Sequence, residues 1–328
     1  MMLKDGIKRV AVLTSGGDAP GMNACIRAFV RTAIIQGIEV LGVRRGYSGL
    51  IGEDLAPMDV RSVGNIVQRG GTILRTSRCK EFSTEEGRAK AAGVLKRNGI
   101  GGLMVIGGDG SFRGAHLLLL EHAVTIVGCP GTIDNDLYGT DFTIGYDTAI
   151  NTALESIDRL RDTAASHDRI FIVEVMGRHS GFIALDVAIS GGAEAALIPE
   201  TRQSLEELSQ TILEGRRRGK TSSIIVVSEG DEEGGAFSIA DRFQSISGLQ
   251  CKVAVLGHIQ RGGCPTARDR ILATKLGSAA AQAMARGVQD CMVGEVGDRV
   301  VYTPFVDTWE KKKAVDMGLY ELIGVLSQ

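Results

Sequence analysis

A repeated local pattern limits what this chain can fold into: a short apolar run leads into a glycine-rich turn, and a helical pattern follows. Residues 103–106 precede the turn GGDGS at 107–111, and residues 10–13 precede the turn TSGGDAPG at 14–21. Near-continuous apolar strands that alternate with helices are typical of a parallel sheet covered by helices on both faces. Further apolar runs that end in glycine-rich or charged turns are 170–173, 224–227 and 253–256.

The composition excludes several classes of protein. With 328 residues, of which 44% are hydrophobic and 5% aromatic, the chain is long enough for two domains with an aliphatic core. A net charge of −2 argues against a general binder of nucleic acid or other polyanions. No apolar stretch is long enough to span a bilayer, and the N-terminal residues do not look like a signal peptide. We therefore expect a cytoplasmic protein with no nucleic-acid and no membrane partner.

The cysteines support the same compartment. None of them forms a C-x-x-C pair, and most lie in or beside apolar segments, so we expect reduced thiols rather than disulfides or a zinc site. They are Cys25, Cys79, Cys129, Cys251, Cys264 and Cys291.

Local signals mark three helices. The segments STEE at 83–86 and SLEE at 204–207 are capping-box patterns, and Asn98-Gly99 predicts where the first of these helices ends. From Thr148 onward, apolar residues recur with helical spacing and predict a third helix.

The two glycine turns named first are candidates for binding phosphate. Gly16 and Gly17 can present backbone amides to an anion, helped by the N-terminus of the following helix. In the second turn, Asp109 is a candidate magnesium ligand and Ser111 a donor to phosphate or water. An ordinary strand-to-helix turn explains the first motif equally well, and helix N-capping is an alternative role for Asp109 and Ser111.

A third motif, PGTIDND at 130–136, follows the apolar run 125–128. Its two acids, Asp134 and Asp136, lie one residue apart at the end of a predicted strand. One could take a proton from a hydroxyl while the other orients a metal or neighbouring groups. A turn rich in Asp and Asn is the structural alternative.

Arginines add cationic groups at the ends of predicted strands, where guanidinium can bind phosphate in a fixed bidentate geometry. Ligands of open α/β sheets bind beyond the carboxyl ends of the strands, so the motifs predict one composite site. This set of motifs predicts phosphoryl transfer to an anionic acceptor. The chain lacks the P-loop and the protein-kinase motif set, so it belongs to neither of those kinds of kinase. The arginines are Arg78, Arg169, Arg178 and Arg261.

Together these residues resemble ATP-dependent 6-phosphofructokinases of the bacterial type. The resemblance implies two Rossmann-like α/β/α domains with mostly parallel sheets and an active site in the cleft between them. A larger ATP-binding domain is expected over 1–145 and 259–308, and a smaller fructose 6-phosphate-binding domain over 146–258 and 309–328. The resemblance extends to about Arg270 and is carried by TSGGDAPGMN at 14–23, GGDGS at 107–111, PGTIDND at 130–136, VMGR at 175–178 and LGHIQRGG at 256–263.

The resemblance implies direct in-line transfer from MgATP to the 1-hydroxyl of fructose 6-phosphate, the committed step of glycolysis. Asp134 matches the base and Thr132 a residue that positions the hydroxyl and the transferring phosphoryl group. Arg178 matches a group that neutralises charge during transfer, and Asp109 the magnesium ligand. ATP-binding positions are Gly17, Tyr47, Arg78, Cys79, Arg88, Gly108, Asp109, Gly110 and Ser111. Sugar-phosphate positions are Thr132, Asp134, Arg169, Met176, Gly177, Arg178, Glu229, Lys252, His258 and Arg261.

The same resemblance implies an oligomer with regulatory sites. Arg169 and Lys252 match cations lent by a neighbouring subunit, which implies a homotetramer. The family pattern usually has arginine at the position of Lys252, glycine at that of Arg75 and an effector arginine at that of Val60. An ADP or phosphoenolpyruvate site is implied by matched positions, although solvent-facing basic residues are the alternative. These positions are Arg27, Arg31, Arg161, Glu194, Arg218 and Lys220.

Gly110 and Gly131 favour ATP as the phosphoryl donor. Pyrophosphate-using relatives typically carry Asp and Lys at these positions, where the Asp takes the volume that an α-phosphate needs. A pyrophosphate-dependent phosphofructokinase stays the alternative within enzymes, because residues 296–328 resemble the tails of relatives with mixed donor use. A catalytically silent sugar-phosphate sensor, or a lipid or nicotinamide-nucleotide kinase with a similar glycine turn, are the remaining alternatives.

Overall fold

The computed structural model describes residues 7–201, 204–230 and 234–327. The chain divides into two compact units, each assembled from three separate segments. The first unit contains Met1–Ile133, Leu137–Thr148 and Arg261–Lys313, and the second contains Asp134–Asp136, Ala149–Gln260 and Ala314–Gln328.

The first unit is built on a seven-stranded sheet. Its strands are β1 (Arg9–Thr14), β2 (Glu39–Val43), β3 (Leu55–Met58), β4 (Gly102–Gly107), β5 (Thr125–Pro130), β10 (Cys291–Val296) and β11 (Arg299–Pro304). They lie in the order β11-β10-β5-β4-β1-β2-β3. All neighbouring pairs from β10 to β2 are parallel, while β3 and β11 pair antiparallel at the two edges. The predicted mostly parallel sheet is confirmed.

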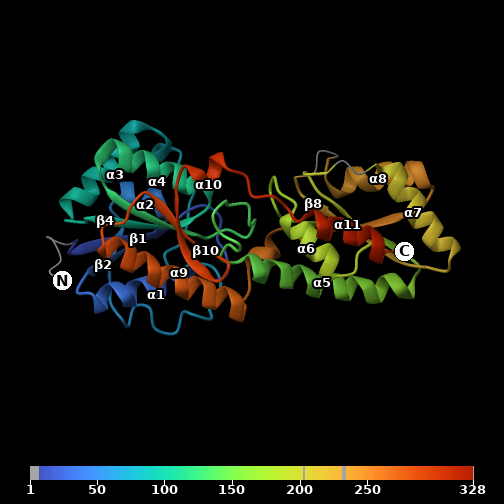
Figure 1. The fold of residues 1–328 in the computed structure, drawn as a ribbon, viewed down its shortest axis with the longest axis horizontal. Helices are drawn as coiled ribbons and strands as arrows, with labels where there is room; N and C mark the ends of the chain where they lie inside the picture. The colour runs from blue at the N-terminus through green and yellow to red at the C-terminus, as the bar shows by residue number, and fades with distance from the viewer. Residues whose placement is uncertain (1–6, 202–203, 231–233, 328) are drawn as a thin grey trace. The chain divides into compact units, whose positions relative to one another are not determined.

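Helices cover both faces of this sheet (Figure 1). They are α1 (Met22–Ile35), α2 (Gly46–Ile51), α3 (Glu85–Arg97), α4 (Asp109–His122), α9 (Ala267–Ala285) and α10 (Asp307–Glu310), with the 3-10 turn η1 (Glu81–Ser83) before α3. Helices α1 and α9 pack together on one face, and α3 and α4 lie on the other.

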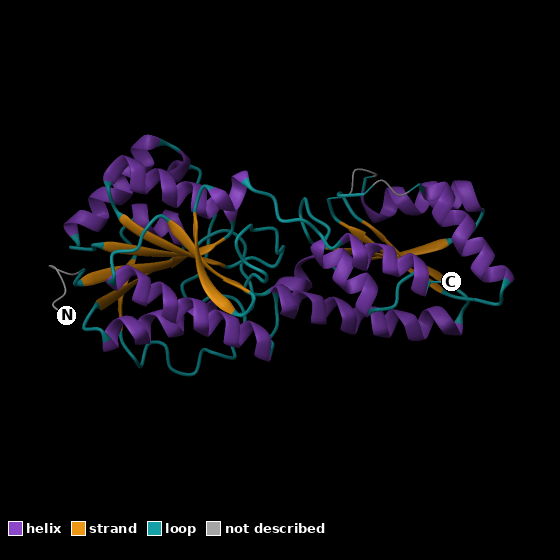
Figure 2. Cartoon of the chain, viewed as in Figure 1, coloured by secondary structure: helices purple, strands orange, loops and turns teal. Residues whose placement is uncertain are grey.

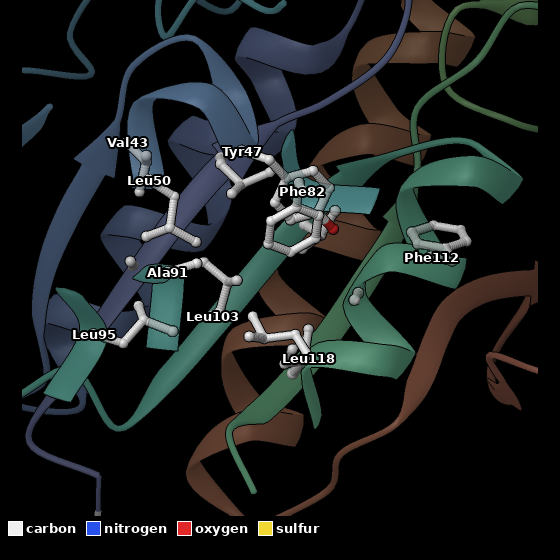
Figure 3. Close-up of a cluster of buried hydrophobic side chains, with 14 of the residues drawn as sticks. Val43, Tyr47, Leu50, Phe82, Ala91, Leu95, Leu103, Phe112 and Leu118 are labelled. Carbon is white, nitrogen blue, oxygen red and sulfur yellow. The ribbon is translucent and has the colours of Figure 1, made fainter. Parts of the chain in front are cut away.

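The core under α3 and α4 is mainly aliphatic, as predicted, but two aromatic pairs anchor it. Tyr47 stacks on Phe82 with ring centroids 3.7 Å apart, next to Leu50 and Leu103 (Figure 3). Phe112 stacks on Phe305 at 5.1 Å, which ties α4 to the segment after β11. Flat aromatic surfaces stack well in such a close-packed layer.

The second unit is built on a smaller, fully parallel sheet. Its strands are β6 (Ile170–Val175), β7 (Ala195–Leu197), β8 (Ser223–Ser228) and β9 (Cys251–Val255), in the order β7-β8-β6-β9. Figure 2 shows helices on both sides of these strands. They are α5 (Tyr146–Ser166), α6 (Phe182–Ser190), α7 (Leu205–Arg217), α8 (Gly235–Ser247) and α11 (Met317–Leu326), with the 3-10 turn η2 (Gly257–Arg261) after β9.

The predicted helices are confirmed, but the cap of the first one lies one residue later than the pattern at 83–86 implies, at Thr84 instead of Ser83. Thr84 caps α3 by accepting a hydrogen bond from the backbone N–H of Gly87, and Ser204 caps α7 in the same way. Helix α3 ends at Arg97, and Gly99 follows in the left-handed conformation at φ 62°.

Strand order places the sequence motifs at special points of each sheet. In the first unit the chain turns from β1 to β2 on one side and places β4 on the other, so the turns after β1 and β4 flank a topological switch point. In the second unit β6 has β8 on one side and β9 on the other. Ligands of open α/β sheets bind at such points, beyond the carboxyl ends of the strands.

Candidate active site

Hydrogen bonds join the two glycine turns of the first unit. The N–H of Ser15, after β1, donates to the carbonyl of Ile106 at the end of β4, at 2.9 Å. The Ser111 hydroxyl donates to that of Ser15 at 2.9 Å, and the Tyr47 hydroxyl donates to the Ser111 carbonyl at 2.6 Å. The turns after β1 and β4 therefore form one rigid unit at the switch point.

The glycines in and next to these two turns have different structural roles. A Cβ on Gly107 would come within 2.6 Å of both the Ser111 hydroxyl and the Ser15 carbonyl, so this glycine permits the close contact between the turns. A Cβ on Gly131 would come within 2.7 Å of Ile106, so packing alone explains this glycine. A Cβ on Gly110 would meet no protein atom within 4 Å, and the space above it is open.

An irregular segment, residues 69–77, is tied across the first turn. Asn23 donates to the carbonyls of Arg69 and Gly70, and its side-chain oxygen accepts from the N–H of Ile73. The Thr76 hydroxyl donates to the Gly16 carbonyl at 2.7 Å.

Two exposed arginines belong to or follow this segment, Arg75 within it and Arg78 just beyond it. The hydrogen bonds from Asn23 and Thr76 thus bring the chain at Arg78 close to the turn that contains Gly17. Arg75 adopts a left-handed conformation at φ 57°, which accounts for glycine at its position in the family pattern.

Asp109 is the first helical residue of α4, and the N-cap is Gly108. The alternative in which Asp109 or Ser111 caps the helix is therefore wrong. The Asp109 side chain is 35% exposed, and its Oδ2 lies 3.9 Å from Nε of Arg113 one turn later. A carboxylate in the first helical turn is favoured by the helix dipole, and Asp109 precedes Gly110 directly in the chain.

Tyr47 and Arg88, both predicted as ATP-binding positions, are buried. Burial raises the pKa of Tyr47 and keeps its hydroxyl protonated as a donor. Arg88 is 6% exposed and makes a bidentate pair with Glu121 at 2.7 and 2.6 Å. It also donates to the carbonyls that precede α3, so it holds the wall formed by η1 and α3. Contact of Tyr47, Arg88 or the half-buried Cys79 with a nucleotide stays a prediction.

The acidic motif leaves β5 through Gly131, whose N–H donates to the Gly107 carbonyl. The motif is thereby attached to the second glycine turn. Thr132 is half-buried, whereas Asp134 is 5% exposed. Asn135 has φ 56°, a conformation that Asn tolerates well, and the reversal there sets the Asp134 backbone. The Ser180 hydroxyl donates to the Asp134 carbonyl at 3.3 Å.

In the second unit, backbone contacts fix the turn that carries Arg178. Gly177 has φ 150°, and a Cβ there would lie 2.6 Å from the Ser180 carbonyl. Glu229 accepts a hydrogen bond from the Arg178 N–H at 2.9 Å, and Gly230 packs directly on the Arg178 carbonyl. Arg178 itself sits at φ 57° with its side chain exposed, which sets the guanidinium at the carboxyl edge of the sheet.

Gln260 links the ends of β6 and β9. This residue is fully buried, and its Oε1 accepts from the N–H of Met176 at 2.8 Å. His258 is exposed on the same 3-10 turn. Arg261, the next residue after Gln260, belongs to the first unit, where its guanidinium occupies the space left by the missing side chain of Gly17. It donates to the Asp18 carbonyl at 3.2 Å.

Arg169 and Lys252 lie at the opposite edge of the second sheet. Arg169 immediately precedes β6, and Lys252 is the second residue of β9. The register pairs Phe171 with Lys252, so the two cations are neighbours at the amino ends of adjacent strands. Arg178 lies beyond the other end of β6, roughly 20 Å away at 3.3 Å per residue.

Three of the predicted effector residues gather at this amino edge. Glu194 is buried, accepts from the N–H of Ile224 and pairs with Lys220 at 2.9 Å. Arg161 donates to the carbonyls of Gly191 and Gly192, in the loop that leads to Glu194. Of the others, Arg218 lies 3.9 Å from Glu214. Arg27 and Arg31 lie on α1 in the first unit, where Arg31 donates to the Val60 carbonyl.

Several residues that build the site escaped the sequence analysis as site residues, among them Thr76, Asn23 and Gln260. Asn23 and Gln260 lie inside the quoted motifs, but their buried hydrogen bonds to backbone groups leave no local pattern. Within the described ranges, no three His, Cys, Asp or Glu side chains form a group that could hold a metal. No described helix is long and apolar enough to cross a membrane. The six cysteines are free.

Comparison with known proteins identifies close relatives. The phosphofructokinase family model matches residues 9–284. "ATP-dependent 6-phosphofructokinase 1" of Thermus thermophilus is 56% identical over 321 residues, which cover 98% of this chain and 100% of the relative. Phosphofructokinase of Pichia pastoris in the T-state has a TM-score of 0.87 at 36% identity, over 98% of this chain and 37% of that one. Pyrophosphate-dependent phosphofructokinase of Marinobacter aquaeolei shares the fold, with a TM-score of 0.83 at 24% identity over 95% of this chain and 86% of that one.

Proposed function

Because the chain belongs to the phosphofructokinase family, we propose that it transfers the γ-phosphoryl group of ATP to the 1-hydroxyl of fructose 6-phosphate. The products are fructose 1,6-bisphosphate and ADP. The observation that carries this proposal is the linked set of turns after β1, β4 and β5. Two of these turns offer glycine amides, and the third carries the buried carboxylate of Asp134.

ATP is the donor in this proposal, and Gly110 supports it. No protein atom lies within 4 Å of the place that a Cβ on Gly110 would take, so the absence of a side chain leaves room for a ligand. A Cβ on Gly131 would clash with Ile106, so this glycine also meets a packing requirement and gives no separate support for ATP. The Thermus thermophilus relative, 56% identical, carries an ATP-dependent name, whereas the likeness to the pyrophosphate-dependent structure concerns the fold alone.

The residues present fit a magnesium ion that arrives with the nucleotide. Mg²⁺ in kinases is held by one or two carboxylates and by substrate phosphates, rather than by an all-protein cage. Asp109 supplies one partly exposed carboxylate beside open space, and the described residues hold no larger acidic or histidine cluster. Bound there, the ion neutralises charge on the phosphates.

The chain's own residues divide the remaining work. Asp134 takes the proton of the 1-hydroxyl, and Thr132, two residues earlier, positions that hydroxyl. Arg178 stabilises the charge that develops on the phosphoryl oxygens. Its turn is held by Glu229 and Gly230, so the guanidinium is oriented before the substrate arrives. In this proposal the first unit binds ATP and the second binds fructose 6-phosphate.

We further propose a cytoplasmic homotetramer. Support comes from Arg169 and Lys252, which lie at the sheet edge opposite to Arg178 and so suit the sugar phosphate of another subunit. Support for an effector site is weaker, because Glu194 already compensates Lys220 within the subunit. An ADP or phosphoenolpyruvate effector that binds there must break or share this ion pair.

A panel of donors and acceptors tests the proposal. The wild-type protein should turn over fructose 6-phosphate with MgATP, and Asp134→Ser should lower kcat by about 10²–10⁴-fold while fructose 6-phosphate binding, measured by calorimetry, is nearly kept. The control Asp241→Ser, on the exposed face of α8, should retain wild-type turnover. Turnover with pyrophosphate and none with ATP would overturn the donor, and a fully active Asp134→Ser would overturn the base.

A further inference from the structure

Arg113 is a cation beside the open space of the second glycine turn that the proposed function does not use. It lies on α4 one turn after Asp109 and three residues after Gly110, and these spacings place neighbours on one helical face. Its Nε is 3.9 Å from the Asp109 carboxylate. A long, half-exposed arginine side chain at this place can reach the open space above Gly110.

The guanidinium of Arg113 stacks on an aromatic ring. Its central carbon lies 5.1 Å from the ring centroid of Trp309, the only tryptophan of the chain. The ring centroids of Trp309 and His116 lie 5.8 Å apart with the rings tilted at 63°, and Nδ1 of His116 hydrogen-bonds to Asp290 at 2.7 Å. Arginine stacks readily on indole, and a stacked guanidinium loses less freedom when it binds an anion.

An exposed ion pair spaced four residues apart on a helix contributes little by itself. Two observations distinguish Arg113 from such a pair. Its partner, Asp109, is the carboxylate that fits a divalent cation, and the adjacent space at Gly110 is not filled by protein. When the Asp109 carboxylate binds a metal, the Arg113 guanidinium is released to bind another anion.

We propose that Arg113, carried on Trp309, is a nucleotide-binding residue that exchanges the Asp109 carboxylate for phosphate oxygens of the metal-bound nucleotide. The proposal rests on the proposed function, because it assumes that ATP occupies this turn. The guanidinium stays stacked on the ring of Trp309 while it changes partner from the carboxylate to the phosphate. The ligand class is the polyphosphate part of a nucleotide, which guanidinium recognises through bidentate hydrogen bonds.

Intrinsic fluorescence reads the exchange directly, because Trp309 is the only tryptophan. Titration of the wild-type protein with MgADP should give a saturable change in emission, and adenosine should give none. In Arg113→Met the change should shrink by at least half and saturate at about tenfold higher MgADP, the loss expected for one charge-assisted hydrogen bond. Arg113→Lys should lie between the two, because it keeps the charge and loses the fork.

Steady-state kinetics give a second readout. Arg113→Met should raise KM for ATP about tenfold and leave KM for fructose 6-phosphate unchanged. Arg97→Met is the matched control, because Arg97 is a similarly exposed arginine of the same unit and pairs with Glu53 at 2.8 Å. This control should match the wild type in both readouts.

The outcomes separate the two claims. If Arg113→Met behaves like Arg97→Met while ATP is still turned over, the inference is wrong and the proposed function stands. If the wild type turns over pyrophosphate and not ATP, the proposed function fails, and a titration with Mg-pyrophosphate then decides on Arg113. An emission that responds to no phosphate ligand overturns the inference in either case.

Discussion

Arg75 is held in the left-handed conformation at φ 57°, where its N–H donates to the Thr72 carbonyl and its carbonyl accepts from the Thr14 hydroxyl. A Cβ in this region costs roughly 1–2 kcal/mol, which glycine avoids. Glycine loses part of that gain to the greater freedom of the unfolded chain. We therefore expect Arg75→Gly to raise the free energy of unfolding by about 0.5–1 kcal/mol, measured by urea denaturation.

Arg75→Ala is the matched variant for this prediction. It removes the guanidinium but keeps the Cβ, so it should not reproduce the gain in stability. If Arg75→Ala stabilises the protein as much as Arg75→Gly, the effect comes from the charge of the side chain, and backbone strain is not its cause.

The sequence indicates which residues a candidate site contains, but it does not predict the hydrogen bonds that hold those residues in place. Asp109 is predicted as a magnesium ligand from its place in a glycine turn after an apolar strand, and the family resemblance adds the predicted role of Gly110. Gln260, which joins two strand ends, could not be assigned in this way, because its partner is the N–H of Met176 and backbone groups carry no sequence signal. At Gly131, which the family resemblance links to the choice of donor, a Cβ would also clash with Ile106, so this glycine has a packing role that the sequence does not reveal.

At the scale of elements, apolar runs and caps predicted strands and helices well, because both signals are local. The alternative role of Asp109 as an N-cap was wrong, since Gly108 takes that position and Asp109 enters the first turn. Sheet order could not be derived from the runs, because pairing of β1 with β4 joins segments about ninety residues apart and depends on the whole unit.

The anchor of α3 is the Arg88–Glu121 pair, and its contribution should depend on pH. The hydrogen bond from Arg88 lowers the pKa of Glu121 below its ordinary value of 4.5. The stabilisation is therefore present above pH 4.5 and lost as the pH falls through the lowered pKa. Glu121→Gln should lower the free energy of unfolding by about 2 kcal/mol at pH 7, and the difference should shrink in acid.

Thermal unfolding of both proteins between pH 7 and pH 3 measures this difference. Glu81→Gln is the control. Glu81, in the turn η1, pairs with Lys90 of α3 on an exposed surface, and such exposed ion pairs contribute little to stability. A Glu121→Gln variant that is destabilised equally at every pH would show that packing, and not the ion pair, is responsible.

At the scale of the whole molecule, the second unit presents two separate sets of basic side chains. Arg178 and His258 follow the carboxyl ends of β6 and β9, whereas Arg169 and Lys252 occupy the amino ends of the same strands. One subunit cannot bring both ends of a strand to one phosphate group, because six residues of strand separate them by roughly 20 Å. If both sets serve one sugar phosphate, as proposed, that site takes residues from two copies of the chain.

Mixed oligomers test this arrangement. Asp134→Ser and the double variant Arg169→Ala/Lys252→Ala should each be nearly inactive alone. We assume that each site takes the base from one subunit and the two cations from another. In a random one-to-one mixture, about one site in four then has both an intact Asp134 and the intact pair Arg169 and Lys252. The mixture should therefore recover about a quarter of wild-type turnover.

A mixture of Asp134→Ser with Arg178→Ala provides the contrast for this experiment. Both residues belong to the second unit of one subunit and are expected to act in the same share of the site. No site in that mixture holds both intact residues, so turnover should stay at the level of the separate variants. If the first mixture also recovers nothing, the cations at the amino edge act within their own subunit or outside the site, and the argument for a shared site fails.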